Sequence, residues 1–159
     1  MAANEQSRGA VELVDALRRR GWTLACAESL TGGLVAAAIV DVPGASDVFR
    51  GGVVAYATDL KAAVLGVSSG QLEQTGPVDR EVALQMARGA RSVLAADCGV
   101  ATTGVAGPGP ADGHEAGTVW IAVSGPRREF ARELHLPGGR SEVRSETVRA
   151  AIELVMETL

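Results

Sequence analysis

The sequence predicts an α/β fold in which helices cover both faces of a mostly parallel sheet, a three-layer α/β/α arrangement. Short apolar runs typical of buried strands alternate along the chain with segments of helical periodicity, which is the pattern of parallel strand-helix-strand units. The last two strands are separated only by residues 124–127. This connection is too short for a crossover helix, so these two strands are predicted to form an antiparallel hairpin.

The first three elements follow from apolar spacing and turn residues. Residues 5–20 carry apolar side chains at helical spacing, and Gly21 ends this helix. An apolar run at 22–27 is the first strand. A helix follows from residue 31 or 32 to about residue 41, where Pro43 and its neighbours stop it.

The middle of the chain contains a second strand and two short helices. The strand is predicted at 52–57, where valines and a tyrosine follow two glycines. Asp59 is the predicted N-cap of a helix at 60–65, and a second short helix covers 68–74.

The remaining elements are longer. Asp79 and Ser141 are the predicted N-caps of helices at 80–95 and 142–159, each with a regular apolar face. Three uncharged or alternating runs bounded by glycine or proline are predicted strands, at 98–103, 117–123 and 129–136.

The composition limits the classes of protein to which the chain can belong. At 159 residues the chain is expected to form a single domain over residues 1–159. A net charge of −4 with scattered basic residues argues against a nucleic-acid partner. Residues 1–9 are polar and the longest apolar run, 34–40, is too short to cross a bilayer, so a cytoplasmic protein with no membrane partner is expected. Cys26 and Cys98 fall inside predicted strands, as buried small side chains rather than a disulfide or metal pair. No metal or cofactor is expected, because no ligand cluster has metal-site spacing.

The most informative segment is the turn at residues 27–33, between the first strand and the following helix. It carries Ser29, Thr31, Gly32 and Gly33. Backbone N–H groups at such a helix start can hold an anion or stabilise negative charge on a carbonyl oxygen, and glycine lets a ligand approach closely. The alternative is that a hydroxyl of this turn only caps the helix.

A second glycine-rich turn leaves the end of the strand at 98–103. It contains Thr103, Gly104, Ala106 and Gly107. If the two strands run parallel, both turns face one crevice at the carboxyl edge of the sheet, where α/β proteins bind ligands. Neither turn has the pattern of a P-loop or a dinucleotide fingerprint. The alternative is that this segment is only a tight connection.

The order and spacing of several segments resemble one family. The segments are residues 27–33, 49–56, 103–109, 117–120 and 137–140, together with Lys61. In these positions the sequence resembles the CinA C-terminal domain family, whose stand-alone members are nicotinamide-nucleotide amidohydrolases. The resemblance covers nearly the whole chain, from about residue 11 to the C-terminus.

The resemblance implies a fold and an activity. The fold is a mixed five-stranded sheet with one antiparallel strand. The activity is hydrolysis of the carboxamide of nicotinamide mononucleotide to nicotinic acid mononucleotide and ammonia, a step of pyridine nucleotide salvage. Some members carry an N-terminal molybdopterin-binding-like domain, for which this chain is too short, so no activity of that domain is expected.

Serine-based amide hydrolysis needs a general base, and the sequence offers an unusual one. His114 lies in a hydrophilic loop and His135 in a late strand, so neither is well placed. Lys61 is the only lysine, and every other basic side chain except histidine is arginine, which does not release its proton near neutral pH. From its position alone, Lys61 is predicted to be a solvent-exposed residue of a helix. With the resemblance, we expect Ser29 to be the nucleophile and Lys61 the base, with Tyr56 assisting through its hydroxyl or packing beside the pyridine ring.

The same reasoning assigns substrate contacts. Thr31, Gly32 and Gly33 suit the oxyanion, and Glu28 either neutralises charge or accepts hydrogen bonds from the turn backbone. Ribose and phosphate contacts are expected from Arg140 and from the second turn, namely Thr103, Gly104, Ala106 and Gly107.

Two other functions stay open from the sequence. The chain could be a nucleotide-binding module without catalysis that acts through a partner protein, or a hydrolase of a different amide. The sequence also leaves open whether two copies associate as a homo-oligomer and share a crevice.

Overall fold

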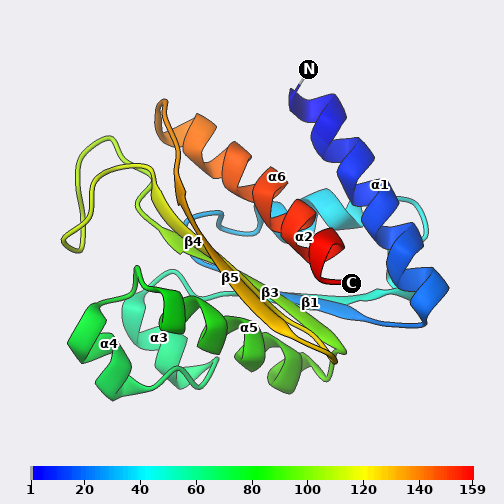
Figure 1. Ribbon diagram of the computed structural model, residues 1–159, viewed down its shortest axis with the longest axis horizontal. Coiled ribbons are helices and arrows are strands. Elements are labelled where there is room, and N and C mark those ends of the chain that lie inside the picture. Colours follow the sequence, from blue (N-terminus) through cyan, green and yellow to red (C-terminus); the bar gives the residue numbers. More distant parts are fainter. Residues whose placement is uncertain (1) are drawn as a thin grey trace.

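Five strands form one sheet in the order β2-β1-β3-β4-β5 (Figure 1). The computed structural model describes residues 2–159, and Met1 of the polar N-terminal segment lies outside them. The strands are β1 (Leu24–Glu28), β2 (Phe49–Val54), β3 (Cys98–Gly104), β4 (Thr118–Ser124) and β5 (Glu129–His135).

The sheet is mixed, and one strand runs against the other four. β1 pairs in parallel with both β2 and β3, whereas β4 pairs antiparallel with both β3 and β5. Only β4 therefore has the opposite direction. The predicted α/β class, the hairpin and the single antiparallel strand are all confirmed.

Helices cover both faces of the sheet (Figure 1). One face carries α1 (Ala2–Arg20), α2 (Leu34–Val40) and α6 (Arg140–Thr158), and the other carries α3 (Thr58–Ala63), α4 (Ser69–Thr75) and α5 (Arg80–Leu94). Side chains alternate across each strand: Leu24 and Cys26 pack under the first group, and Ala25 and Ala27 under the second. The short 3₁₀ helix η1 (Ala45–Asp47) precedes β2.

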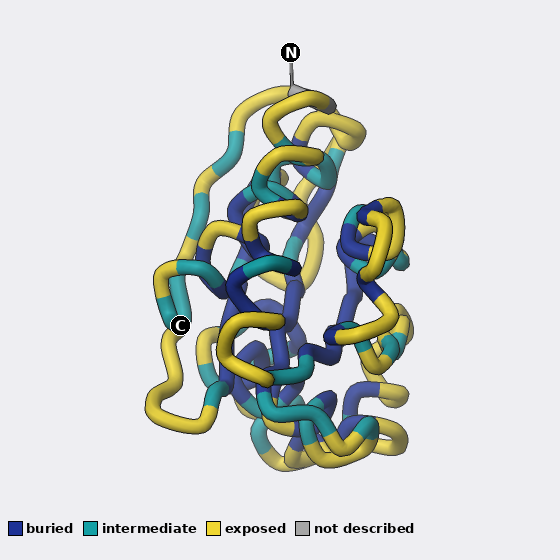
Figure 2. Tube along the Cα trace, turned by 90° about the vertical axis from the view of Figure 1, so that its right-hand side faces the viewer, coloured by how far each residue is buried: buried dark blue, intermediate teal, exposed yellow. Residues whose placement is uncertain are grey.

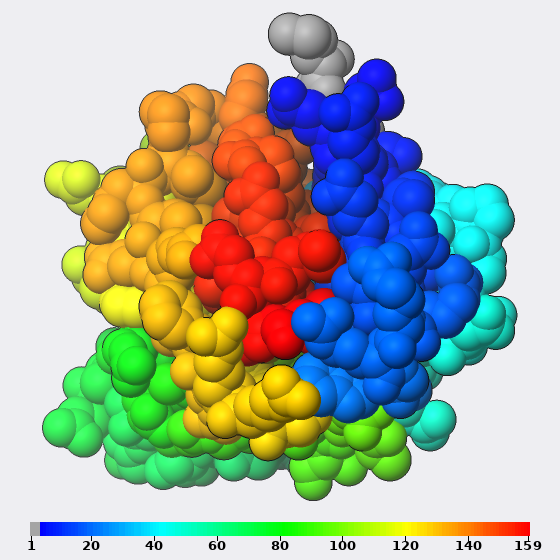
Figure 3. Space-filling view, turned by 45° about the vertical axis from the view of Figure 1, so that its right-hand side comes forward, coloured from blue at the N-terminus to red at the C-terminus, as the bar shows by residue number. Residues whose placement is uncertain are grey.

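Burial follows this layering. The central strands are dark in Figure 2, and the outward turns of the helices are exposed. All five residues of β1 are buried, as expected for the central strand of a sheet covered on both faces. Figure 3 shows α1 and α6 side by side on the outer face.

Two predicted helix caps are wrong. α3 begins at Thr58 with Ala57 as its N-cap, and α6 begins at Arg140 with Gly139 as its N-cap, so neither Asp59 nor Ser141 caps a helix. β2 also lies three residues earlier than predicted at each end. Gly52 belongs inside this strand because a Cβ there would lie 2.6 Å from the Cys26 sulfur, a close approach that only glycine permits.

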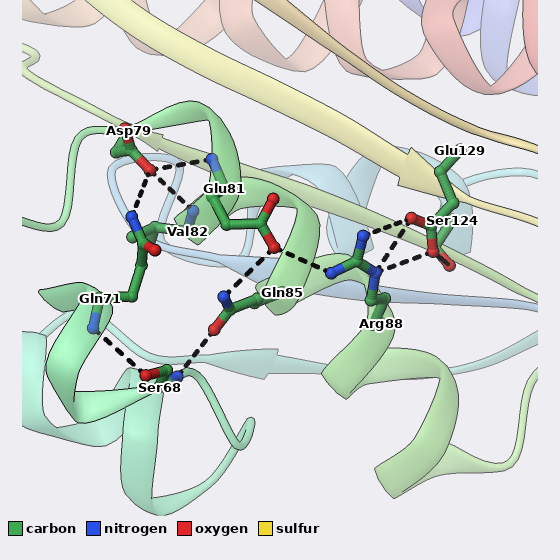
Figure 4. Close-up of polar contacts among 9 residues, drawn as sticks. All are labelled: Ser68, Gln71, Asp79, Glu81, Val82, Gln85, Arg88, Ser124 and Glu129. Atoms are coloured by element: carbon green, nitrogen blue, oxygen red, sulfur yellow. Dashed lines mark hydrogen bonds and ion pairs between the residues drawn. The ribbon is translucent and has the colours of Figure 1, made fainter. Parts of the chain in front are cut away.

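The N-cap of α5 is confirmed. The Asp79 carboxylate accepts hydrogen bonds from the backbone N–H groups of Glu81 (2.9 Å) and Val82 (3.2 Å). The same carboxylate accepts from Gln71 of α4, and a chain of polar contacts continues along α5 to Glu129 of β5 (Figure 4). These contacts connect α4 and β5 to α5. They hold the helices of this face against the sheet.

Candidate active site

A cavity of about 280 Å³ opens at the carboxyl ends of the parallel strands. Its lining comes from the segments that follow β1, β2 and β3 and from the first residue of α6. The lining residues are Ser29, Leu30, Tyr56, Thr58, Lys61, Pro77, Val78, Thr103, Gly104, Val105, Ala106, Gly107, Gly109, Ala111, Asp112 and Arg140. Pockets for drug-sized ligands occupy roughly 300–1,000 Å³. The volume therefore lies at the lower end of this range and suits a small ligand.

Ser29 and Lys61 meet at the bottom of this cavity. The Nζ atom of Lys61 lies 3.0 Å from the Oγ atom of Ser29. Ser29 follows β1 directly, and Lys61 lies in α3, the helix that follows β2, so the parallel pairing of two neighbouring strands brings them together. Lys61 is 1% exposed and Ser29 7% exposed. A buried lysine beside a serine hydroxyl is the arrangement expected of a nucleophile and its base.

Two backbone carbonyls hold the Lys61 amine in place. Nζ donates hydrogen bonds to the carbonyl oxygens of Ala55 (2.8 Å) and Tyr56 (3.4 Å). Carbonyl oxygens only accept hydrogen bonds, so both N–H groups of the neutral amine donate to these two carbonyls. The remaining lone pair of Nζ then faces the Ser29 hydroxyl, which donates to it. The two carbonyls thus orient Lys61 as a proton acceptor.

The burial of Lys61 changes its titration. Desolvation lowers the pKa of Lys61 from 10.5 to about 8, while the negative charge of Asp112 acts in the opposite direction. A lysine with this pKa has a substantial neutral fraction near physiological pH, which a general base requires.

Ser29 is held by the neighbouring strand. Its backbone N–H donates to the carbonyl oxygen of Thr102 at 3.1 Å, and the Thr102 hydroxyl forms a 2.8 Å hydrogen bond with the hydroxyl of Thr31. Thr31 is fully buried in this contact. The two hydroxyls of the turn at residues 27–33 therefore have different roles. Ser29 faces the cavity, and Thr31 hydrogen-bonds the turn to β3.

Glu28 has the second of its two predicted roles. Its buried carboxylate accepts hydrogen bonds from the backbone N–H groups of Val35 (2.8 Å) and Ala36 (3.1 Å), in the first turn of α2. The helix begins at Leu34, later than predicted, with Gly33 as its N-cap in a left-handed conformation (φ 103°). Neither Ser29 nor Thr31 caps α2, because Glu28 already occupies its free N–H groups.

Four predicted substrate contacts lie outside the cavity lining. They are Glu28, Thr31, Gly32 and Gly33. Gly32 lies under the guanidinium of Arg144, which donates to the carbonyl oxygens of Leu30 and Thr31. These four residues shape and brace the turn that presents Ser29.

The second turn lies in the cavity as expected. Thr103, Gly104, Ala106 and Gly107 all line it, and the hydroxyl of Thr103 donates to the carbonyl oxygen of Pro77 at 2.8 Å. Within residues 2–159, the backbone N–H groups of Leu30, Ala106 and Gly107 have no hydrogen-bond acceptor. All three residues line the cavity, so these N–H groups are the candidates to bind a substrate oxygen.

Tyr56 and Arg140 lie together at the rim. Tyr56 is 62% exposed, and its hydroxyl accepts a 3.4 Å hydrogen bond from Arg140, which also donates to the carbonyl oxygen of Gly107 at 2.8 Å. Among the described residues, no hydrogen bond joins the Tyr56 hydroxyl to Ser29 or Lys61. Of the two roles expected for Tyr56, the geometry favours packing of its ring beside a ligand.

Sequence reasoning gave no site role to eight lining residues: Leu30, Thr58, Pro77, Val78, Val105, Gly109, Ala111 and Asp112. Only Asp112 had a local signal, because Asp112-Gly113 is a typical two-residue turn sequence. Neither His114 nor His135 lines the cavity. Within residues 2–159, no group of three or more histidine, cysteine or acidic side chains is placed to hold a metal ion. No helix in that range is long and apolar enough to cross a membrane.

Comparison with known families gives one match over nearly the whole chain. The family model described as the CinA C-terminal domain matches residues 6–159. A CinA-like protein of Frankia casuarinae is 49% identical over 143 residues, which is 90% of this chain and 33% of that protein. A putative competence-damage inducible protein of Bacillus subtilis is 39% identical over 93% of this chain and 36% of that protein. The chain thus spans about a third of the length of these relatives.

Solved structures show the same fold. The competence/damage inducible protein CihA from Agrobacterium tumefaciens superposes with a TM-score of 0.92 at 35% identity, covering 96% of this chain and 94% of that one. A CinA superfamily protein from Escherichia coli superposes with a TM-score of 0.93 at 32% identity, covering 97% and 90%. Both structures match almost the full length of this chain.

Proposed function

The chain belongs to the CinA C-terminal domain family, and we propose that it is an amidohydrolase that removes ammonia from the carboxamide of nicotinamide mononucleotide. The observation that carries the proposal is the 3.0 Å contact between Ser29 Oγ and a buried Lys61 Nζ in a cavity of about 280 Å³. The substrate identity rests on the family resemblance.

The first half-reaction forms an acyl-enzyme. Lys61 takes the proton of the Ser29 hydroxyl, and the Ser29 oxygen attacks the carboxamide carbon to give a tetrahedral intermediate. Free N–H groups at the cavity wall, such as that of Leu30, stabilise the negative oxygen. The C–N bond then breaks, and the Lys61 ammonium returns its proton to the departing nitrogen, which leaves as ammonia. The products are an ester on Ser29 and a neutral Lys61.

The second half-reaction repeats the same proton path with water. Lys61 takes a proton from water, and the hydroxide oxygen attacks the ester carbon. The bond from carbon to the Ser29 oxygen then breaks, and Ser29 regains a proton from Lys61. The product is the ring carboxylic acid, which ionises at neutral pH.

The direct test follows ammonia and carboxylate formation from nicotinamide mononucleotide. We expect Ser29→Ala to lower kcat by roughly 10⁴-fold or more, as removal of a catalytic nucleophile does. The control is Ser92→Ala, because Ser92 is exposed on α5 and outside the cavity. Absence of ammonia release by the wild-type protein, or equal release by the Ser29→Ala variant, contradicts the proposal.

A second experiment tests the covalent step. Hydroxylamine competes with water for an acyl-enzyme ester and converts the acyl group to a hydroxamate. The wild-type protein should form the hydroxamate of the substrate, and the Ser29→Ala variant should not. Equal formation by both proteins would point to direct attack by water.

A further inference from the structure

Three charged side chains line the cavity: Lys61, Asp112 and Arg140. None of them forms an ion pair with another described residue, although exposed ion pairs occur elsewhere on the surface. Asp112 and Arg140 therefore do not neutralise each other. Lys61 is already held by Ser29 and two carbonyls, so an unpartnered anion and a cation border the same small cavity.

The backbone holds Asp112 in a defined position. Asp112 and Gly113 both have positive φ (52° and 80°), and the flanking residues Ala111 and His114 exchange two backbone hydrogen bonds of 3.0 and 2.9 Å. This is a tight two-residue hairpin turn, in which asparagine and aspartate tolerate the left-handed conformation at the first position. The side chain of Asp112 forms no hydrogen bond within residues 2–159. The turn therefore presents an unpaired carboxylate to the cavity.

Asp112 lines the same cavity as the Lys61 amine. It is the charged group whose field acts on the Lys61 ammonium, so it lies within electrostatic range of the atoms that carry the chemistry. Arg140 instead contacts the rim, at Tyr56 and Gly107. The hydrogen bonds of Arg140 hold this cation at the rim, whereas Asp112 stays unpaired and its charge acts on Lys61.

We propose that Asp112 is a specificity-determining residue that selects carboxamides attached to a positively charged ring, while Arg140 receives the negative group at the other end of the ligand. The inference rests on the proposed function and deepens it. The preferred substrate class is a zwitterion with a cationic ring beside the amide and an anionic phosphate farther away. A neutral ring forms no charge pair with the Asp112 carboxylate, and it partly removes water from that carboxylate without compensation.

The test varies the ring charge and the residue charge independently. Dissociation constants are measured by calorimetry for nicotinamide mononucleotide and for benzamide riboside 5′-phosphate, which has the same carboxamide, ribose and phosphate on an uncharged ring. The protein carries Ser29→Ala so that neither ligand is hydrolysed. We expect Asp112→Asn to weaken binding of the cationic ligand by about tenfold, the effect of one partly screened charge pair, and to change binding of the neutral ligand less than about twofold.

The substitution and its control separate charge from structure. Asparagine is nearly isosteric with aspartate and also suits a turn with positive φ, so Asp112→Asn should leave the loop folded. Asp59→Asn removes the same charge from an exposed position of α3 outside the lining and should leave both affinities unchanged. The effect of Asp112→Asn on the cationic ligand should also shrink at high salt.

Each outcome is decisive. If Asp112→Asn weakens binding of both ligands equally, Asp112 supports the loop and does not discriminate by the charge of the ring. If it weakens binding of neither ligand, Asp112 has no role in binding. Either result overturns the inference while ammonia release by the wild-type protein still supports the proposed function. Charge-dependent binding without ammonia release would support the inference and overturn the proposed function instead.

Discussion

The pH dependence of hydrolysis depends directly on the state of Lys61. In the proposed mechanism only the neutral amine accepts the Ser29 proton, so the rate should follow the deprotonated fraction of Lys61 and rise with pH. Burial lowers the pKa of this lysine to about 8. The perturbation is therefore a change of pH from 7 to 9, applied to the wild-type protein with nicotinamide mononucleotide.

The magnitude follows from that pKa. With a pKa of about 8, roughly 9% of Lys61 is neutral at pH 7, half at pH 8 and roughly 91% at pH 9. The value of kcat/KM, which reports groups of the free enzyme, should increase about tenfold over this interval and then level off. A lysine at its ordinary pKa of about 10.4 would be less than about 0.1% neutral at pH 7, and the rate would rise about a hundredfold without levelling.

The assay measures initial rates of ammonia release between pH 6.5 and 9.5 at constant ionic strength. The substrate phosphate titrates near pH 6, at the edge of this range, so a plateau above pH 8 belongs to the enzyme. The background at each pH comes from the Ser29→Ala variant. Lys61→Met should be inactive throughout, because its side chain has no basic atom.

Three results would refute this reasoning. A rate independent of pH between 6.5 and 9 would show that Lys61 is not the base, and so would a Lys61→Met variant with wild-type activity. A rate still rising tenfold per pH unit at pH 9 would show that burial does not lower the pKa of Lys61. Rates must be initial rates, with protein stability checked at each pH.

Substitutions at three further positions test other parts of the structure. The hydroxyl of Tyr56 does not reach Ser29, so Tyr56→Phe should change kcat less than about threefold. The ring of Tyr56 borders the cavity, so Tyr56→Ala should raise KM about tenfold. Steady-state kinetics measures both values. Glu28→Ala removes the acceptor for two N–H groups of α2 and should lower the free energy of unfolding by about 2 kcal/mol, measured by urea denaturation. Gly89→Ala should lower it by about 1–3 kcal/mol, because a Cβ at this position overlaps the carbonyl group of Leu65 in the loop between α3 and α4.

Matched variants control the two stability measurements. Glu73→Ala removes an exposed carboxylate from α4 and should change stability by less than about 0.5 kcal/mol. Gly70→Ala, in the same helix, places a Cβ in ordinary van der Waals contact with Ser68 Oγ (3.7 Å) and should stabilise the helix by up to about 1 kcal/mol. Stabilisation by Gly89→Ala, or a Glu28→Ala variant as stable as Glu73→Ala, would contradict the packing described above. For Tyr56, a large loss of kcat in the Phe variant would assign its hydroxyl to the chemistry.

Local patterns predicted most of the fold correctly, and the errors share a cause. The hairpin and the Asp79 cap depend on neighbours close in sequence, so loop length and capping chemistry were enough to find them. The start of α2 was misplaced because the free N–H groups of that helix are satisfied by Glu28, a side chain at the end of the preceding strand. β2 was misplaced because its first residues, 49–51, pair with Leu24 and Ala25 of β1, which are distant in sequence.

The candidate site divides in a similar way. Lys61 was recognisable as a candidate base because it is the only lysine of the chain, yet its 3.0 Å contact with Ser29 depends on the parallel pairing of β1 and β2. Asp112 was not selected from the sequence, since an exposed aspartate in a loop is ordinary. Its position in the cavity depends on a hairpin turn that folds back from the end of β3.

The sequence by itself determined the order of helices and strands, the antiparallel hairpin and the two glycine-rich turns at one edge of the sheet. These features depend on periodicity, loop length and turn chemistry, which are local properties of the chain. Only the tertiary structure decided that Glu28 points inward to cap α2, that Lys61 is buried against Ser29 and that Asp112 faces the cavity. Burial, charge and hydrogen-bond partners at these positions come from segments far apart in sequence, so they exist only once the sheet has assembled.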